Sequence, residues 1–486
     1  METNSTNVNG THYTVPLLIN GEEVTTETTF PITSPSTLQF LHHSSSASVA
    51  EAKSAISAAT AALASWRATK PSYRRDILLR AADILAERSD EIARYMKEET
   101  GALPAFAEGF NVPTTVEMIK DVAGRLAGAL GGSIPVCAQE DVSAMVVKEP
   151  MGVVLGIAPW NAPLVLGFRA FVPALAAGCT AVLKGSELSP RTFHCIGSIM
   201  AAAGLPKGCL NVIYTRQADA ADVTKSLIEN PAVKKVNFTG STAIGRIIAA
   251  TAGKALKPVL MELGGKASAI ICEDADLQKA ATQVALGSFL HSGQICMATE
   301  RILVRKEIVG DFKEALEKAV EGIFGGTKEA PVLIQSAAVE KNQKLIKDAV
   351  GKGAKVVYGD VLREEDSKYR MRPIVVEGVS NEMDLYHTES FGPTVSLIEV
   401  ESDEEAIALA NDTTYGLTGA VFTRDLRRGL KIAGQIESGA VHINSMTIHD
   451  EASLPHGGVK ESGWGRFNAE EGINEFLRLK TITFQA

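Results

Sequence analysis

Hydrophobic positions divide the chain into a helical part and a longer part in which short apolar runs alternate with helices. From residue 48 to about 128, small and apolar residues recur at steps of three and four, as at Ala52, Ala55 and Ala59. This spacing places side chains on one face of a helix. Residues 15–45 carry short extended runs and turns instead. The pattern therefore predicts short strands followed by a mostly helical segment.

Beyond residue 152 the pattern changes to short apolar runs separated by helical spacers. The first series predicts strands at 153–157, 180–183, 210–213 and 233–238. A second series predicts strands near 267–272, 302–304, 354–357, 395–399 and 440–443. Strands that alternate with helices are typical of open parallel α/β sheets. We therefore expect an α/β fold with two such units, and we place the boundary between them at residues 262–265.

Two segments fall outside both series. Residues 129–150 read as an extended hairpin beyond the main sheet, and the run 480–484 reads as a terminal strand. Strands with unpaired backbone groups invite pairing with another chain. We expect residues 129–150 and 473–486 to form an oligomerisation arm, in which the terminal strand can pair with the 134–148 arm of a neighbour. Both a homodimer and a homotetramer remain open.

One cysteine and one glutamate stand out as candidates for chemistry. Cys296 follows a turn containing Gly293, and such a turn can expose a thiol and offer it free backbone N–H groups. The alternative is a buried structural cysteine. Glu262 precedes the pair Gly264-Gly265, a corner that could hold a general base near a thiol. Its alternatives are a surface charge and a carboxylate at a helix N-terminus.

Together, the run 262–266 (Glu-Leu-Gly-Gly-Lys) and the run 293–296 (Gly-Gln-Ile-Cys) resemble the aldehyde dehydrogenase superfamily. The resemblance extends from about residue 15 to the C-terminus. It implies an α/β fold with a Rossmann-like NAD-binding domain (1–128 and 151–262), an α/β catalytic domain (263–455) and a protruding β arm.

The resemblance also implies a reaction. Cys296 would attack an aldehyde to give a thiohemiacetal, hydride transfer would leave a thioester, and Glu262 would activate the water that hydrolyses it. The side-chain amide of Asn161 and the backbone N–H of Cys296 would stabilise the oxyanion. For Asn161 the alternative is a cap on the following helix.

Candidate cofactor contacts lie where the predicted strands end, the edge at which α/β sheets bind ligands. Lys184 could donate to a ribose hydroxyl and Glu187 could accept from one, or the two could form a solvated ion pair. A helix opens after Gly240-Ser241, and its N–H groups suit a pyrophosphate, although Ser241 could simply cap that helix. The cofactor positions expected in full are Trp160, Lys184, Glu187, Gly240, Ser241, Gly245, Leu263, Glu389 and Phe391. Since a carboxylate at 187 would repel a 2′-phosphate, NAD is expected, and the neighbouring Lys184 keeps NADP open.

Two residues after the predicted strand 153–157 bear on the substrate. Ala162 stands where many aliphatic-aldehyde members of the family carry an aromatic residue, so it leaves room for a ring. Arg169 could donate to a phenolic oxygen or could belong to a structural ion pair. The run 449–463 resembles the salicylaldehyde and vanillin dehydrogenases of the family. An aromatic aldehyde is therefore expected. An aliphatic aldehyde or semialdehyde, and a cofactor-independent thiol esterase, remain the alternatives.

Composition limits the class of protein. The 486 residues carry a net charge of −9 without a basic block, which argues against nucleic acid and anionic membranes as partners. Six cysteines without a C-x-x-C pair predict reduced thiols and neither a zinc site nor disulfides. Residues 1–13 are polar and lack the apolar core of a secretory signal, so a disordered tail and a cytoplasmic enzyme are expected. Three departures from the family are Cys179, where it more often has Asn, Gly185, where it usually has Pro, and a shorter loop at 325–333.

Overall fold

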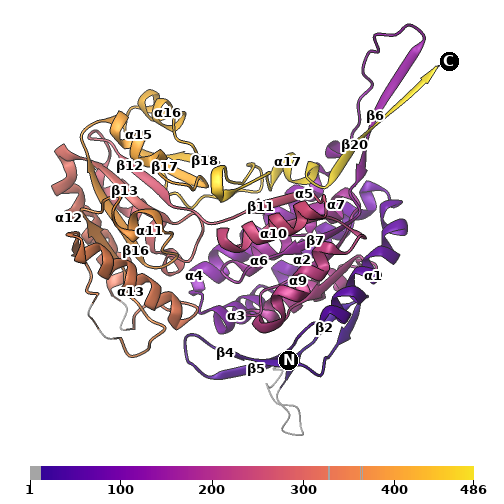
Figure 1. Ribbon diagram of the computed structural model, residues 1–486, viewed down its shortest axis with the longest axis horizontal. Helices are drawn as coiled ribbons and strands as arrows, with labels where there is room; N and C mark the ends of the chain where they lie inside the picture. Colours follow the sequence, from indigo (N-terminus) through magenta and orange to yellow (C-terminus); the bar gives the residue numbers. More distant parts are fainter. Residues whose placement is uncertain (1–12, 327–328, 362, 364, 486) are drawn as a thin grey trace.

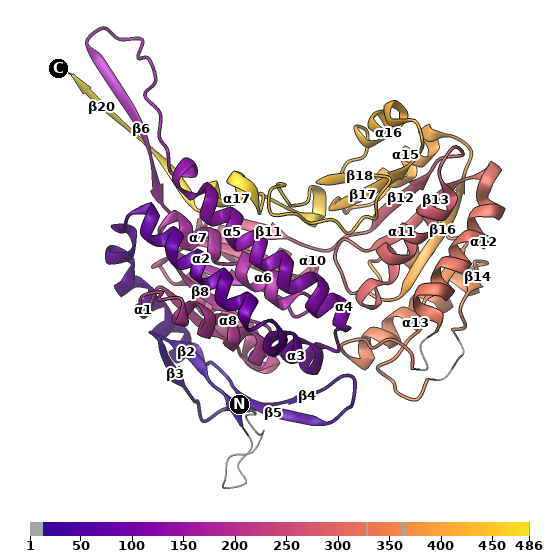
Figure 2. The same ribbon diagram turned by 180° about the vertical axis from the view of Figure 1, so that it is seen from behind.

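The computed structural model describes residues 13–326, 329–361, 363 and 365–485. Two sheets, each flanked by helices, form two lobes, and a two-stranded arm projects from the first lobe (Figures 1 and 2). The tail expected at residues 1–13 lies outside this part of the chain except for Tyr13. Positions 327 and 328 of the shorter loop also lie outside it.

The helical segment expected from residue 48 is confirmed. Ser48 begins it with a capping box, in which its hydroxyl accepts from Ala50 N and its own N–H donates to the Glu51 carboxylate over 2.8 Å. The helices are α1 (Val49–Arg67), α2 (Pro71–Glu87), α3 (Ser89–Thr100), α4 (Pro104–Phe106) and α5 (Val112–Ala129), with a π-helical turn at Ala107–Asn111. Helix α1 packs against β8 (Thr180–Lys184) and β9 (Leu210–Ile213) of the first sheet, whereas α2, α3 and α5 form an outer layer over the helices on its other face (Figure 2).

The first sheet has the strand order β19-β11-β10-β7-β8-β9-β2-β3. Its five central strands are parallel, and β19, β2 and β3 are antiparallel to their neighbours. The strands are β2 (Leu17–Ile19), β3 (Glu22–Val24), β7 (Val153–Ile157), β8 (Thr180–Lys184), β9 (Leu210–Ile213), β10 (Val233–Thr239), β11 (Val259–Glu262) and β19 (Gly463–Trp464). All four strands predicted in the first series are confirmed.

Helices connect these parallel strands, as the alternating pattern requires. They are α6 (Pro163–Arg169), α7 (Val172–Ala177), α8 (Pro190–Ala202), α9 (Ala220–Glu229) and α10 (Thr242–Lys254). A small separate sheet, with β5 between β1 and β4, packs below them. Its strands are β1 (Thr14–Val15), β4 (Thr29–Thr33) and β5 (Phe40–Ser45).

The second sheet has the order β14-β15-β16-β13-β12-β17-β18, and every strand except β14 is parallel to its neighbours. The strands are β12 (Ala267–Ile271), β13 (Thr299–Arg305), β14 (Lys355–Tyr358), β15 (Ile374–Glu377), β16 (Thr394–Val400), β17 (Thr418–Phe422) and β18 (Ala440–Ile443). Its helices are α11 (Leu277–Phe289), α12 (Val309–Val320), α13 (Ser336–Gly351), α14 (Asp384–His387), α15 (Asp403–Asn411) and α16 (Leu426–Ala433). The five predicted strands are confirmed, and β15 and β17 were not predicted.

The arm corrects one expectation. Strand β6 (Val142–Pro150) pairs antiparallel with β20 (Leu477–Gln485) of the same chain. Pairing of the terminal strand with a neighbour's arm stays a prediction. The hairpin expected within residues 129–150 is not formed. Between these residues the structure has one isolated bridge, from Ser133 to Val146. The Glu149 carboxylate on β6 holds the register by ion pairs with Arg478 and Lys480 on β20. Side chains such as Leu479 and Phe484 remain exposed on the arm.

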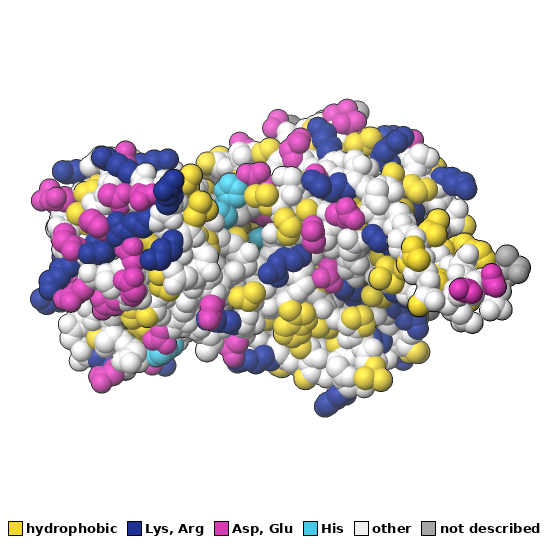
Figure 3. Space-filling view, turned by 90° about the horizontal axis from the view of Figure 1, so that it is seen from above, with side chains coloured by type: hydrophobic (Ala, Val, Ile, Leu, Met, Phe, Trp, Pro, Cys, Tyr) yellow, Lys and Arg dark blue, Asp and Glu magenta, His cyan; other side chains and the backbone are white. Residues whose placement is uncertain are grey.

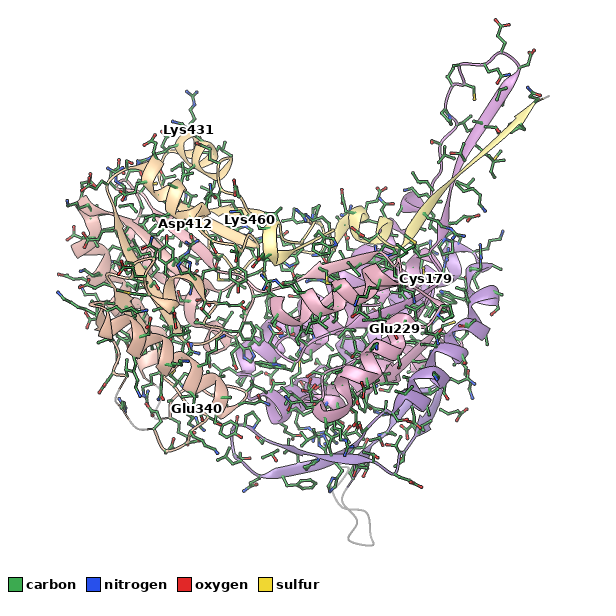
Figure 4. The ribbon with its side chains drawn as sticks, viewed as in Figure 1. Cys179, Glu229, Glu340, Asp412, Lys431 and Lys460 are labelled. Carbon is green, nitrogen blue, oxygen red and sulfur yellow. The ribbon has the colours of Figure 1, made fainter. Side chains whose placement is uncertain are left out.

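The chain passes between the lobes twice. Strand β11 of the first sheet ends at Glu262, and β12 of the second sheet begins at Ala267. The chain returns from β18 to β19, and α17 (Ala469–Asn474) follows. Lys460, labelled in Figure 4, ties this return to the second lobe because its ammonium donates to the carbonyl oxygen of Asn411 over 3.0 Å. The carboxyl ends of the first sheet therefore face the N-terminal ends of β12 and β13. In the described part of the chain, no helix has the length and apolar character that crossing a membrane requires.

Candidate active site

A cavity of about 310 Å³ lies where the two lobes meet. Its walls include the three predicted catalytic residues, which come from three different segments: Asn161 after β7, Glu262 at the end of β11, and Cys296 before β13. Six of the nine predicted cofactor residues also line it, namely Trp160, Gly240, Ser241, Leu263, Glu389 and Phe391. The structure thus brings together residues that are far apart in the sequence.

Cys296 lies just beyond a tight turn at the end of α11. His291 and Ser292 have the left-handed conformation, with φ values of 50° and 58°, which non-glycine residues rarely adopt. The Cys296 side chain keeps part of its surface exposed and lines the cavity, whereas Cys179, labelled in Figure 4, is fully buried. Cys296 is therefore largely enclosed but open to the cavity, unlike a structural cysteine that is buried on all sides.

The corner after β11 brings Glu262 and Cys296 together. A side chain at Gly265 would collide with the carbonyl oxygen of Cys296, so glycine is required for the two segments to approach this closely. Glu262 is 1 % exposed, so it is not a surface charge. It is the last residue of strand β11, so it does not lie at a helix N-terminus either. Among the described residues, neither of its carboxylate oxygens has a hydrogen-bond partner of normal geometry.

Burial sets the protonation of both groups. Burial raises the pKa of Glu262 to about 7. The neighbouring Cys296 thiol and Arg169 guanidinium lower this pKa, but by less than burial raises it. Burial also raises the pKa of Cys296 well above that of an ordinary thiol, and the adjacent carboxyl of Glu262 adds to this effect. A carboxyl with a pKa near 7 can accept or release a proton at neutral pH, as a general base must.

The amide of Asn161 is fixed beside the cysteine. Its Nδ2 donates to the carbonyl oxygen of Gln294 over 3.0 Å. Helix α6 begins at Pro163 and no side chain caps it, so the capping alternative for Asn161 is wrong. Gln294 was missed in the sequence. It is fully buried, and its amide group donates to His291 O over 3.1 Å and accepts from Ile334 N over 2.9 Å.

Helix α10 begins at the edge of the cavity. Ser241 is its N-cap and accepts from Ile244 N, so the alternative that Ser241 caps the helix is confirmed. Ser241 also lines the cavity. Gly245 lies one turn further, and a Cβ there would come within 2.5 Å of Leu263 Cδ2. Glycine therefore lets α10 pack closely against the segment after Glu262. The opening N–H groups of α10 form a surface that suits a phosphate.

Two predicted ribose contacts lie away from the cavity wall. Lys184 ends β8, the strand next to β7, Glu187 lies three residues further on, and neither lines the cavity. Burial lowers the pKa of Lys184, and the nearby Glu187 carboxylate works in the opposite direction. The two are close enough to interact, as expected for residues three apart. Their contact with a cofactor stays a prediction.

The loop before β16 closes the cavity from the second lobe. The Glu389 carboxylate accepts from Gly265 N over 2.9 Å, and burial raises its pKa to about 7. Phe391 has a φ of 47°, and its ring stands at 88° to that of Trp160 with centroids 6.1 Å apart. These aromatic walls and the carboxylate can enclose a ring and a ribose.

Two buried charges that the sequence did not reveal hold this loop. The Glu300 carboxylate accepts from the backbone N–H of Ser390 over 2.8 Å and from that of Phe391 over 3.2 Å. Lys266 forms a buried ion pair with Glu300 at 2.7 Å. Lys266 belongs to the run 262–266, but its partner lies in β13, and no local pattern connects the two.

The predicted substrate residues lie behind the cavity. Neither Ala162 nor Arg169 is part of its wall. The Arg169 side chain is 3 % exposed and forms an ion pair with Asp450, and its guanidinium lies 5.6 Å from the Phe467 ring centroid. The ion-pair alternative is therefore confirmed for Arg169, and its contact with a substrate stays a prediction. Asp450, which the sequence did not identify, also accepts from Asn468 Nδ2 over 2.8 Å.

The donors and walls of this cavity fit a dinucleotide and a thiol-based reaction. The opening of α10 provides backbone N–H groups, Glu389 provides a carboxylate, and Trp160 and Phe391 provide ring walls. Across residues 13–485, apart from the few positions not described, no group of three or more His, Cys, Asp or Glu side chains could hold a metal ion.

Comparisons with known proteins agree with this geometry. The aldehyde dehydrogenase family model matches residues 22–482. The chain is 43 % identical to a vanillin dehydrogenase of Pseudomonas sp. strain HR199, over 97 % of this chain and 98 % of that protein. It is 36 % identical to a salicylaldehyde dehydrogenase of Pseudomonas putida, over 94 % and 95 % of the two chains. The crystal structure of a salicylaldehyde dehydrogenase from Pseudomonas putida G7 complexed with salicylaldehyde matches with a TM-score of 0.93 and 34 % identity, over 98 % of this chain and 99 % of that one.

Proposed function

Since the chain belongs to the aldehyde dehydrogenase family and is an NAD(P)-dependent aldehyde dehydrogenase, we propose that it oxidises an aromatic aldehyde to the carboxylic acid with NAD. The observation that carries the proposal is the convergence of Cys296, Glu262 and Asn161 in one cavity, where Glu262 is buried and has no hydrogen-bond partner of normal geometry among the described residues. A buried carboxyl in this state is available to take a proton from the thiol and later from water.

In the first step the Cys296 sulfur bonds to the aldehyde carbon. The thiol proton has to leave as the bond forms, because burial holds its pKa well above the usual range. The Glu262 carboxylate is the adjacent acceptor. A thiohemiacetal results, with the former carbonyl oxygen carrying negative charge.

The Asn161 amide and the backbone N–H of Cys296 stabilise that charge. Asn161 needs no reorganisation, because its bond to the Gln294 carbonyl already fixes the amide. Preorganised donors of this kind contribute about 3–4 kcal/mol to transition-state stabilisation. When bound, NAD supplies the acceptor for the hydride that the thiohemiacetal carbon loses, and Cys296 is left as a thioester.

Glu262 completes the cycle. After the proton taken from the thiol has passed to solvent, its carboxylate takes a proton from water, whose oxygen attacks the thioester carbon, and the bond to Cys296 Sγ breaks to release the acid. The thiolate that leaves regains a proton from Glu262. The same carboxyl thus serves both half-reactions, which requires a pKa near the working pH.

The cofactor would be held mainly by the first lobe. The opening of α10 at Gly240 and Ser241 suits the pyrophosphate, with Leu263 and Gly245 setting the approach of the helix. Glu389 would hold the nicotinamide ribose. Lys184 and Glu187 would hold the adenosine ribose, and the Glu187 carboxylate would disfavour a 2′-phosphate. NAD is therefore proposed over NADP.

An aromatic substrate is proposed because of the relatives and the small residue at Ala162. The vanillin and salicylaldehyde dehydrogenases named above act on aromatic aldehydes, and the likeness to them covers nearly the whole chain. Ala162 lies directly after Asn161 and leaves space beside the oxyanion position. Arg169 is proposed to approach a phenolic oxygen of the substrate from its ion pair with Asp450.

The enzyme is further proposed to act as a homo-oligomer in the cytoplasm. The arm β6–β20 carries exposed apolar side chains that a second copy would cover. All six cysteines in the described part of the chain are free thiols, as suits a reducing compartment.

The test is NADH formation, followed by absorbance, with the purified protein and NAD. Benzaldehyde, vanillin, salicylaldehyde and hexanal are compared at equal concentration. Ring aldehydes are expected to give the higher kcat/KM. Preference for hexanal would refute the aromatic assignment, and formation of acid without NAD would favour a thiol esterase.

A further inference from the structure

Phe193, in the first turn of α8, is packed between two glycines of neighbouring segments. A Cβ at Gly185 would come within 2.4 Å of Phe193 Cγ, and one at Gly167 would come within 3.1 Å of Phe193 Cε1. Gly185 directly follows Lys184 at the end of β8, and Gly167 lies in α6, which starts two residues after Asn161. The Phe193 ring therefore sets how closely the loop after β8 approaches α8.

The Phe193 ring has no room to move aside. The atom that a Cβ at Gly185 would meet first is Cγ, and rotation of the ring about its Cβ–Cγ bond leaves Cγ in place. A swing of the whole ring would push it into filled space, because Phe193 is fully buried and α8 packs against α2, α3, α6 and β9. A side chain at Gly185 therefore has to displace either α8 or the loop after β8.

A buried carboxylate from another helix holds the first turn of α8. Glu99, near the end of α3, is 2 % exposed and accepts from Arg191 N over 2.8 Å and from Thr192 N over 3.0 Å. The Thr192 hydroxyl donates to the same carboxylate over 2.7 Å. Ser189 provides no side-chain cap, so Glu99 satisfies N–H groups that the start of a helix leaves free. Helix α8 is therefore the fixed partner in the contact.

The loop after β8 is the part that can move. Gly185 N donates to Ile213 O over 2.9 Å and keeps the start of the loop on the sheet. Further on, Leu188 N donates to Ser186 Oγ over 3.2 Å, and Ser189 N donates to Ser186 O over 3.3 Å. These bonds lie within the loop, so they move with it and do not oppose its displacement.

The same loop carries the two side chains expected to hold the adenosine ribose. Lys184 precedes Gly185 directly, and Glu187 follows two residues later. A hydrogen bond weakens steeply when its donor and acceptor separate by even a fraction of an ångström beyond about 3.2 Å, so both side chains depend on where the loop lies. The family usually has Pro at position 185, and glycine here leaves the space that the Phe193 ring fills.

We propose that Phe193, through its contact with Gly185, positions the loop after β8 for the adenosine half of the cofactor. The inference rests on the proposed NAD-dependent oxidation and adds a positioning residue to its cofactor site. Phe193 acts through the loop and does not touch the cofactor. The nicotinamide half is assigned to other segments, with Glu389 as its ribose contact, so the contact governs cofactor affinity and not the chemical steps.

The test is Gly185→Ala, measured against the unmodified enzyme. KM for NAD should rise about tenfold, a change that the loss of two hydrogen bonds of ordinary strength accounts for. With saturating NAD and benzaldehyde, kcat should stay within about threefold. Isothermal titration calorimetry with ADP-ribose, which has the adenosine and the pyrophosphate but no nicotinamide, should show a similar loss of affinity without any catalysis.

ADP-ribose is an anion, so its binding must be separated from general attraction to the surface. On the face of the molecule in Figure 3, the described Lys and Arg side chains are interspersed with Asp and Glu, so the probe meets mixed charge there and not a basic patch. Gly124→Ala on α5 is the matched control, because a Cβ at that position meets nothing within 4 Å. It should leave both KM for NAD and the affinity for ADP-ribose unchanged.

A second pair of variants shows whether the effect passes through the ring. Phe193→Ala removes the atoms that the new Cβ would meet, so adding Gly185→Ala to it should change KM for NAD less than about threefold. The added methyl occupies space that the ring has left, so this comparison also serves if Gly185→Ala alone does not fold. Thermal unfolding identifies the folded variants, and the assays are run well below the lowest midpoint.

Unchanged KM for NAD and unchanged ADP-ribose affinity in folded Gly185→Ala would overturn the inference. A tenfold rise on adding Gly185→Ala to Phe193→Ala would also overturn it, because the effect would not pass through the ring. A fall in kcat with unchanged ADP-ribose affinity would place the contact in the chemical steps and contradict it as well. If the unmodified protein oxidises benzaldehyde with neither NAD nor NADP, the proposed oxidation fails, and the ADP-ribose titrations still decide the role of the contact.

Discussion

The side-chain amide of Asn161 donates to the carbonyl oxygen of Gln294 over 3.0 Å, two residues before Cys296. The bond joins the loop after β7 of the first lobe to the cysteine turn of the second. It places a neutral donor beside the thiol before any substrate is present. The position of the Asn161 amide therefore depends on contact between the two lobes as well as on strand β7, which precedes it.

Replacing this donor should lower the rate with little effect on folding. Asn161→Ala removes one oxyanion donor, and we expect kcat to fall about 10²–10³-fold. Asn161→Asp should be at least as damaging, because a carboxylate repels the developing charge. Thermal unfolding of both variants identifies any loss that comes from misfolding. A fall of less than about fivefold in a folded Asn161→Ala enzyme would contradict the assigned role.

Gly265 should tolerate no side chain. In Gly265→Ala the new Cβ would collide with the carbonyl oxygen of Cys296, and that backbone would have to shift. A displacement of the nucleophile by about 1 Å costs on the order of 10²-fold in rate. Gly253→Ala is the matched control, because a Cβ there meets nothing within 4 Å. The control should keep its activity and gain up to about 1 kcal/mol of stability from helix propensity. Similar activity in the two variants would refute the packing argument.

The protonation of Glu262 should appear in the pH dependence of stability. Burial raises its pKa from 4.5 to about 7 in the folded protein, so the folded state binds the proton more tightly than the unfolded one. This contribution to stability is fully present below about pH 4.5 and is lost as the pH rises through 7. A pKa shift of this size changes the free energy of unfolding by roughly 3 kcal/mol.

Glu262→Gln removes this dependence. Near pH 5 the variant and the unmodified protein should unfold at similar temperatures, and at pH 8 the variant should be the more stable by up to roughly 3 kcal/mol. Differential scanning calorimetry at the two pH values gives the comparison. A stability difference that does not change with pH would show that Glu262 is already ionised well below pH 7.

Glu300 should affect cofactor binding although it is not part of the cavity wall. Its carboxylate holds the backbone of Ser390 and Phe391, next to Glu389. Glu300→Gln weakens these charge-assisted bonds and leaves Lys266 without its counter-ion, so KM for NAD should rise roughly tenfold and the melting temperature should fall. Glu340→Gln, on the exposed side of α13 (labelled in Figure 4), is the control. An unchanged KM for NAD in Glu300→Gln would show that this loop does not depend on Glu300.

The alternation of apolar runs predicts most of the two sheets because buried parallel strands are continuously hydrophobic. Strands 153–157, 210–213 and 440–443 have the predicted bounds. Strand β11 (Val259–Glu262) was not predicted as a strand, because its short run leads directly into the polar corner of the site. Strand β17 (Thr418–Phe422) contains a glycine, which weakens the strand signal.

Candidate residues could be predicted where a local motif carried them, as for Cys296 and Glu262. Their partners could not. Arg169 and Asp450 are 281 residues apart in the sequence, and no local pattern relates them. The same applies to β6 and β20, which pair within one chain although each segment by itself equally suits a partner from another chain. Long-range pairs are decided by tertiary packing, which one sequence does not display.

The central claim is a thioester on Cys296 that Glu262 resolves. Mass spectrometry of Glu262→Gln, incubated with NAD and benzaldehyde and then digested, tests it most directly. We expect one equivalent of NADH per site, no further turnover, and a benzoyl group on the peptide that contains Cys296. The doubly substituted protein Cys296→Ala, Glu262→Gln should carry none. A steady rate in Glu262→Gln, or a benzoyl group on a different residue, would contradict the account.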